Sequence, residues 1–284
     1  MKPLLRRSLL HEGRQWAVLD RKRSAHGILL VIQRRDGSGV VRRRLLNDDL
    51  IQNTYDPEQQ KSLSTFTGAL TGLALAYAGQ MESVLCIGMG AGMVPRQLAT
   101  FGAVVDVVEI NPDITRLAER YFDFDPTAVN LIIDEGRSFA EQSLDSYDVV
   151  VLDAFLGISA PPHLFTLEAM RVLRDRLRLS GVLVINTFGE FDAKRREMSA
   201  CLDCTLRKVF GAQSVGAHAS GQGNVFHVAT CEQKLEPMRL PDFTGEHPAI
   251  QFELQLMWKG RREFEPGHGR ILTDAMLPSP GFTD

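Results

Sequence analysis

From residue 83 onward, short apolar runs alternate with longer stretches in which apolar residues recur at helical spacing. Nearly continuous apolar runs are typical of strands buried on both faces. Strands that alternate with helices predict a parallel sheet with crossover helices. The predicted strands are 83–87, 104–108, 128–133, 148–152 and 182–187, and the predicted helices are 93–101, 112–121, 164–177 and 192–210.

The flanking segments follow other patterns. Three β-like runs lie near the start of the chain, and the Asp-Gly-Ser-Gly sequence at 36–39 indicates a hairpin between the last two. These runs are 15–19, 27–33 and 40–46; residues 60–79 and 250–259 have helical periodicity, and 213–217 with 224–229 predicts an antiparallel pair that closes the sheet.

These elements predict an α/β fold, a Rossmann-like domain with a mostly parallel seven-stranded sheet after a small N-terminal β-domain. The expected boundaries are 1–55 for the N-terminal β-strand domain, 56–235 for the Rossmann-like domain and 236–284 for a C-terminal extension.

Three glycines, Gly88, Gly90 and Gly92, follow the first strand of this domain, and Glu109 ends the second. Glycine lets the backbone turn sharply and approach a ligand closely. A carboxylate at the tip of the second strand can accept both hydroxyls of a ribose. The dinucleotide pattern G-x-G-x-x-G would need glycine where Met93 stands. The spacing therefore favours a ligand with adenosine and no pyrophosphate, such as S-adenosylmethionine or a relative.

Acids also follow the third and fourth strands, where ligands of open parallel sheets bind. Asp134 and Glu135 compete to accept from an adenine amino group, and either could instead cap the next short helix. Asp153 lies where a reacting group would be and is the candidate proton acceptor; the alternative is a solvated loop acid. In the loop 154–166, a candidate lid, His163 could move a proton or merely cap the following helix.

Composition narrows the class of protein. The chain has 284 residues, of which 44% are hydrophobic and 24% charged, as in ordinary globular proteins. No apolar run approaches the ~20 residues of a membrane span, and the start does not have the pattern of a secretory signal. We therefore expect a cytoplasmic protein that does not bind membranes. The lone pair Cys201 and Cys204 lacks the partners of a zinc site, so no metal is expected.

Charge is uneven along the chain. Residues 1–44 hold twelve Lys or Arg and three acids, a net charge of +9, which leaves −12 on the remainder. A basic segment can bind nucleic acid, or it can form a solvated face of hairpins or a surface that pairs with the acidic body or with a second subunit. Because the arginines are interleaved with strand-like runs and not with stacking aromatics, the second interpretation is favoured and nucleic acid is not the expected partner. The Asp-Ala-Phe-Leu sequence at 153–156 also lacks the D/N-P-P-Y/F step of base amino methyltransferases.

Taken in order, several segments resemble the spermidine synthase family, aminopropyltransferases that share the fold of class I methyltransferases. The resemblance covers about 45–230 and is carried by LLNDDLIQN (45–53), VLCIGMGAGMVPRQL (84–98), VVDVVEINPDI (104–114), DEGRSF (134–139), YDVVVLDAF (147–155), LFTLEAMRVLRDRLRLSGVLVINTF (164–188) and GQGNVFHVAT (221–230). The resemblance implies a homo-oligomer, a dimer or tetramer, and an N-terminal β-domain.

The same resemblance implies roles for individual residues. Gln52 would contact the amino-acid tail of the nucleoside, residues 88–92 its backbone side and Glu109 its ribose. Glu135 falls in the position of the adenine-side acid, and Asp153 matches the first acid of the family's D-S-S-D-P step.

Two departures concern the amine half of the site. Leu156 replaces the second acid of that step, and the family's Y-H/Q-E element has no counterpart in NTYDPEQQKSLSTF (53–66). A cationic diamine needs carboxylates, because an unpaired buried charge is costly. We therefore expect a transferase that uses S-adenosylmethionine or its decarboxylated form and moves an aminopropyl group to a small-molecule amine, without the usual diamine pocket. Methyl transfer and non-catalytic nucleoside binding are the alternatives.

Overall fold

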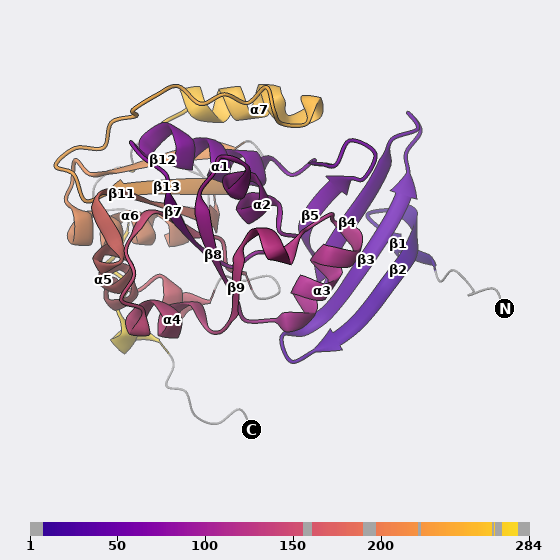
Figure 1. The fold of residues 1–284 in the computed structure, drawn as a ribbon, viewed down its shortest axis with the longest axis horizontal. Coiled ribbons are helices and arrows are strands. Elements are labelled where there is room, and N and C mark those ends of the chain that lie inside the picture. The colour runs from indigo at the N-terminus through magenta and orange to yellow at the C-terminus, as the bar shows by residue number, and fades with distance from the viewer. Residues whose placement is uncertain are drawn as a thin grey trace.

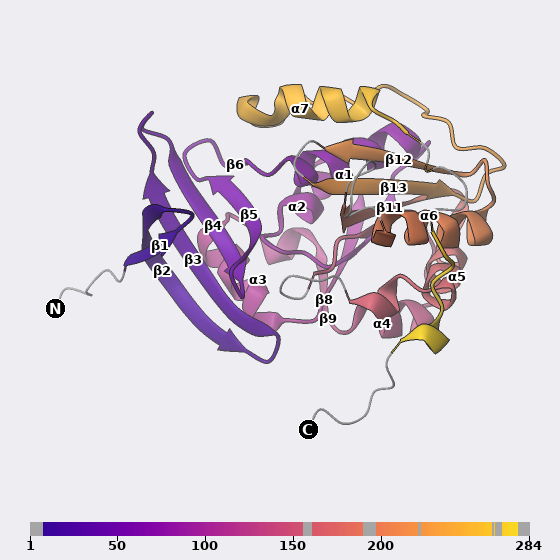
Figure 2. The same ribbon diagram turned by 180° about the vertical axis from the view of Figure 1, so that it is seen from behind.

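The computed structural model describes residues 8–155, 161–189, 197–220, 223–262, 264 and 269–277. Two β-sheets stand side by side in it, a six-stranded antiparallel sheet at one end and a larger mixed sheet covered by helices (Figures 1 and 2). This arrangement confirms the predicted fold, a Rossmann-like domain preceded by a small β-domain.

The N-terminal sheet has the simple order β1-β2-β3-β4-β5-β6. Asp36 accepts hydrogen bonds from the backbone N–H groups of Ser38 and Val40 and so stabilises the hairpin between the third and fourth strands, as predicted. The first, fifth and sixth strands were not predicted from the sequence. The strands are β1 Ser8–His11, β2 Arg14–Ser24, β3 Gly27–Arg35, β4 Val41–Asn47, β5 Leu50–Asp56 and β6 Lys61–Ser62. The domain boundaries stay a prediction.

One aromatic residue was overlooked in the basic segment. Trp16 is buried against Ile32 and Leu46, and the guanidinium groups of Arg34 and Arg44 lie 5.0 and 4.7 Å from its ring centroid. The expectation that no stacking aromatic accompanies these arginines is therefore wrong. Because Trp16 is only 1% exposed, however, its ring has no free face for a nucleic-acid base.

The seven strands of the second sheet follow the order β12-β13-β11-β10-β7-β8-β9. The five strands from β11 to β9 in this order are parallel, and β13 pairs antiparallel with both β11 and β12, as the closing pair predicts. The strands are β7 Ser83–Ile87, β8 Val104–Glu109, β9 Asn130–Ile133, β10 Tyr147–Leu152, β11 Leu177–Phe188, β12 Val215–Ser220 and β13 Asn224–Thr230.

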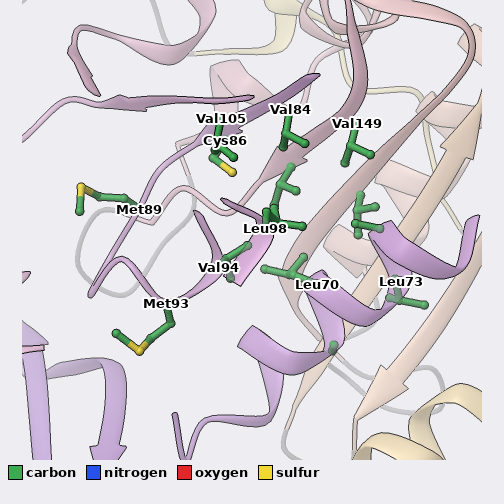
Figure 3. Close-up of a cluster of buried hydrophobic side chains, with 14 of the residues drawn as sticks. Leu70, Leu73, Val84, Cys86, Met89, Met93, Val94, Leu98, Val105 and Val149 are labelled. Carbon is green, nitrogen blue, oxygen red and sulfur yellow. The ribbon is translucent and has the colours of Figure 1, made fainter. Parts of the chain in front are cut away.

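Helices cover both faces of this sheet. Figure 3 shows Leu70 and Leu73 of α1 and Leu98 of α2 packed towards strand residues such as Val84 and Val149. The α1 face also contains residues of α2, α3 and α7, and the opposite face carries α4, α5 and α6. The helices are α1 Thr65–Tyr77, α2 Met93–Thr100, α3 Pro112–Tyr121, α4 Gly136–Gln142, α5 Leu167–Asp175, α6 Glu197–Phe210 and α7 Pro248–Lys259.

The helix predicted over 164–177 is shorter at both ends. Thr166 caps α5 by accepting from the backbone N–H of Ala169 at 3.3 Å, so the helix begins at Leu167. Leu177 already belongs to β11, where it pairs with Tyr147. Residues 192–196 of the helix predicted over 192–210 lie outside the described part of the chain.

Candidate functional site

The three glycines after β7 take conformations that other residues rarely adopt. Their φ angles are +85° at Gly88, +51° at Gly90 and +77° at Gly92. A Cβ at Gly88 would lie 2.3 Å from the carbonyl oxygen of Asp153, and one at Gly92 would lie 2.4 Å from the ring of Phe124. Gly90 has no neighbour within 4 Å of that position. Glycine therefore allows close packing at the two ends of the turn and leaves open space at its centre.

Glu109, at the end of β8, accepts a hydrogen bond from this turn and stabilises it. Its side chain is 6% exposed; Oε2 accepts from the backbone N–H of Met89 at 3.1 Å, and Oε1 accepts from that of Asn111 at 2.8 Å. Burial raises the pKa of the Glu109 carboxyl, and these backbone hydrogen bonds oppose the rise. The carboxylate thus joins the glycine turn to the start of α3, which Asn111 caps.

The two acids after β9 differ in their surroundings. Glu135 caps α4, because its side chain accepts from the N–H groups of Arg137 and Ser138, and it also lies 3.0 Å from His163 Nε2. Burial acts to raise the pKa of Glu135, but these hydrogen bonds outweigh it and the pKa is lowered. Asp134 is exposed and accepts from the backbone N–H of Glu135. The helix-capping alternative is thus the observed arrangement for Glu135.

Asp274, near the C-terminal end of the described chain, pairs with Arg137 of α4, two residues after Glu135. Arg137 donates to both oxygens of Asp274, at 2.8 and 2.7 Å, and to the carbonyl oxygen of His163 at 3.3 Å. The Asp274 carboxylate raises the pKa of Arg137, and Arg137 lowers the pKa of Asp274. The backbone N–H of Asp274 donates to the side chain of Glu168 on α5, and this hydrogen bond positions Asp274. Sequence analysis had no signal for this long-range pair.

Asp153 lies directly after β10, with its backbone N–H bonded to the carbonyl oxygen of Ile87 at 2.9 Å. Its Oδ1 accepts from Asn186 Nδ2 at 2.8 Å, and Asn186 in turn accepts from Asn224 at 3.0 Å. Burial raises the pKa of Asp153 to about 6, against the opposing effect of the Asn186 hydrogen bond. A carboxylate with this pKa is ionised at neutral pH and can accept a proton.

Two neighbouring cavities meet at Asp153, which with Gln52, Met89, Gly90 and Phe155 lines both. The narrow one, about 60 Å³, is lined by Gly88, Glu109, Asn111, Asp134, Glu135 and His163. The wider one, about 370 Å³, lies between the N-terminal sheet and the glycine turn. The amide nitrogen of Gln52 is buried without a partner among the described residues. All the predicted site residues except Gly92 line one cavity or both.

The wider cavity has side chains that sequence analysis did not single out. Asn53, Thr54, Ser64, Thr67, Asn186 and Asn224 supply polar groups, Phe66, Phe155 and Phe188 supply aromatic surface, and Arg42 and Arg44 supply positive charge. The rings of Phe155 and Phe188 lie 4.6 Å apart. Several of these residues come from β4, β5 and β13, far in sequence from the glycine turn.

Some predictions fall outside what the structure describes. Leu156 and the part of the candidate lid at 156–160 lie outside the described residues. Within the described part of the chain, no group of three His, Cys, Asp or Glu side chains could hold a metal ion, and no helix there is long and apolar enough to cross a membrane.

The family of spermine/spermidine synthase domains matches residues 64–215, and the chain belongs to this family. This confirms the resemblance found in the sequence. This chain is 34% identical over 163 residues to a polyamine aminopropyltransferase of Vibrio vulnificus. The match covers 55% of this chain and 53% of that protein. The chain is 36% identical over 144 residues to an N-terminal histidine N-methyltransferase of Emericella nidulans, covering 49% and 25%. The matched regions thus span about half of one curated relative and a quarter of the other.

Among solved structures, the fold resembles the spermidine synthase of Thermotoga maritima, with a TM-score of 0.65, 16% identity and 86% of each chain covered. The TM-score shows a common fold, and at this identity the likeness shows the fold alone.

Proposed function

We propose that the protein transfers an aminopropyl group from decarboxylated S-adenosylmethionine to an amine. The observation that carries this proposal is the position of Asp153, a carboxylate of raised pKa at the junction of two cavities. The donor would occupy the narrow cavity and the acceptor the wider one. Membership of the spermine/spermidine synthase family supports the choice of reaction.

In the donor half, the main chain at 88–92 would pass along the nucleoside and Glu109 would accept the ribose hydroxyls. Asp134 would accept from the adenine amino group, because Glu135 already caps α4. Gln52 would meet the tail that carries the sulfonium, since it lines both cavities.

The chemical step needs few protein groups, since the sulfonium donor carries its own driving force. The lone pair of the amine nitrogen attacks the carbon next to sulfur, the carbon–sulfur bond breaks, and its electrons leave on a neutral thioether. The new ammonium group releases a proton, which Asp153 accepts. Alignment of the two reactants across the junction supplies the remaining rate enhancement.

Methyl transfer from S-adenosylmethionine is the second candidate. Two observations favour it: the Emericella relative bears the name of a methyltransferase, and Asp153 is the only carboxylate among the described residues that line the wider cavity. The chemistry at Asp153 would be the same, with a methyl carbon as the point of attack.

The test supplies the full chain with each donor in turn and a panel of amines, and measures the thioether co-product by mass spectrometry. Methylthioadenosine indicates aminopropyl transfer, and S-adenosylhomocysteine indicates methyl transfer. Asp153→Asn should bind the donor in calorimetry but form neither co-product. Donor binding without any co-product in the unmodified protein would refute catalysis and support a nucleoside-binding role.

We also propose that the protein is a homo-oligomer, which the family resemblance supports. We further propose that it lies in the cytoplasm, which its four free cysteines support. Light scattering on the eluting protein would measure its mass; a monomer over the whole working range of concentration would contradict the first proposal. Localisation of a tagged full-length protein by microscopy or fractionation would test the second, and recovery outside the cytoplasm would contradict it.

A further inference from the structure

The charge of the wider cavity is unusual for a site that would hold a diamine. Its charged residues within the described chain are Arg42, Arg44 and Asp153. Arg42 and Arg44 are two positions apart on β4, so they project from the same face of the strand. Arg43, between them, projects from the other face of β4. It donates to Gln33 Oε1 and to the backbone carbonyl oxygen of Tyr121 on α3. The cavity therefore has two positive groups on one wall and one negative group at its junction with the donor cavity.

Both cavity arginines pair with acids that lie outside the cavity. Arg44 donates from Nη1 to Glu12 at 2.6 Å, stacks over Trp16, and has only 14% of its side chain exposed. Arg42 donates from Nε to Asp36 at 2.8 Å and is 35% exposed. Neither acid lines the cavity.

Each guanidinium gives one N–H group to its acid, and the structure pairs none of the other N–H groups with a described residue. The Nε atom of Arg44 is buried without a partner. Arginines with fixed planes and remaining donors suit an oxyanion, because a guanidinium binds a carboxylate through two parallel hydrogen bonds.

A diamine would be poorly served by this arrangement. One ammonium must lie at Asp153 to lose its proton. The other would then lie towards two guanidinium groups with no described carboxylate to pair with, and an unpaired buried charge of that kind disfavours binding. A carboxylate at the same position would be paired.

We propose that the wider cavity recognises a carboxylate at Arg42 and Arg44 while an amine lies at Asp153. The acceptor is then an amino acid in the broad sense, a primary amine joined to a carboxylate by a short chain. This inference rests on the proposed transferase function. The same recognition could be directed at the carboxylate of an undecarboxylated donor, whose tail reaches the junction at Gln52.

The experiment compares three acceptors with four-carbon chains, namely 4-aminobutyrate, butylamine and putrescine, with donor saturating. We expect kcat/KM for 4-aminobutyrate to exceed that for butylamine by about tenfold, the effect of a charged hydrogen bond or two. Arg42→Gln should reduce this ratio about tenfold, and Arg42→Lys should restore part of it. The matched control is Arg35→Gln, which removes an exposed arginine outside the cavity that pairs with Glu58.

A second arm separates the two sources of the carboxylate. Calorimetry without acceptor compares S-adenosylmethionine with its decarboxylated form, in the unmodified protein and in Arg42→Gln. If the donor supplies the carboxylate, S-adenosylmethionine binds more tightly and only its affinity falls in the variant, while the acceptor series shows no preference. Thermal unfolding of each variant checks that it is folded.

Putrescine as the best acceptor, together with equal ratios and donor affinities in Arg42→Gln and the unmodified protein, would overturn the inference. If no acceptor reacts, the proposed function fails by itself. Calorimetry of 4-aminobutyrate against butylamine then decides the carboxylate site independently: tighter binding of 4-aminobutyrate that Arg42→Gln abolishes supports it, and equal binding overturns it.

Discussion

Replacement of Asp153 by Asn should make the protein more stable while it removes the transfer activity. Burial raises the pKa of this carboxyl from 3.8 to about 6. At neutral pH the folded protein therefore carries a negative charge on Asp153 that burial disfavours. That difference corresponds to about 3 kcal/mol, at roughly 1.4 kcal/mol per tenfold change in proton affinity. Asp153 keeps part of its surface in the cavities, so we expect a gain of about 1–3 kcal/mol. The asparagine side chain can still accept the hydrogen bond from Asn186.

The sign of the pH dependence follows from linkage. The folded protein holds the Asp153 proton more tightly than the unfolded chain, so the unmodified protein loses stability as pH rises from about 3.8 to about 6. The variant lacks this loss, because an asparagine side chain cannot ionise. The difference between the two proteins should thus be near zero in acid, about half complete at pH 5 and constant above pH 7. The proposed transfer by the unmodified protein should rise around pH 6, the pKa of Asp153 in the folded protein, because Asp153 must be ionised to accept a proton.

Urea unfolding at a series of pH values between 5 and 8 measures this difference directly. Asp145→Asn is the matched control, because Asp145 is exposed and lies outside both cavities. A variant at position 153 that is less stable than the unmodified protein at pH 8, or a difference that does not change with pH, would refute the reasoning.

Four further substitutions test the donor half. Glu109→Ala should weaken donor binding by about 1–3 kcal/mol in calorimetry, the cost of lost hydrogen bonds to a charged group; unchanged affinity would contradict the ribose role. Asp274→Asn should raise the KM for the donor by more than it lowers kcat, because Arg137 loses its bidentate partner; a fall in kcat alone would contradict a positioning role. Gly88→Ala should destabilise folding by more than about 2 kcal/mol, and Gly90→Ala by less, since only the first Cβ meets a neighbour; urea unfolding that ranks them the other way would contradict this.

The strands of the larger sheet other than β11 were predicted to within three residues at each end. β7 is an apolar run followed by glycine, and β8 is an apolar run interrupted only by Asp106 that ends in Glu109, so both strands have a local signal. β11 is longer than predicted, because Arg178, Leu179 and Ser180 interrupt its apolar pattern at exposed positions. In β5, polar residues such as Asn53 and Thr54 are buried or line the wider cavity, which hides the alternation by which a strand is recognised.

The candidate site was predictable where it follows from strand order and, for Gln52 on β5, from the family resemblance. Carboxyl ends of neighbouring parallel strands meet at one edge, and this rule led to the glycine turn, Glu109 and Asp153. Arg42 and Asp274 could not be found in this way. The first comes from a different sheet and the second from the C-terminal extension, and their places depend on how distant segments pack.

Short backbone contacts at the ends of β8, β7 and β10 separate the structural supports of the two cavities. Gly88 donates to the carbonyl oxygen of Val108 and Asp153 donates to that of Ile87, so backbone hydrogen bonds hold the glycine turn beside Asp153, the proposed proton acceptor. The arginine-bearing wall of the other cavity belongs to β4, which lies before the matched family region at residue 64. Under the proposed function, side chains on β4 can therefore change substrate preference while the glycine turn and Asp153 keep their relative positions.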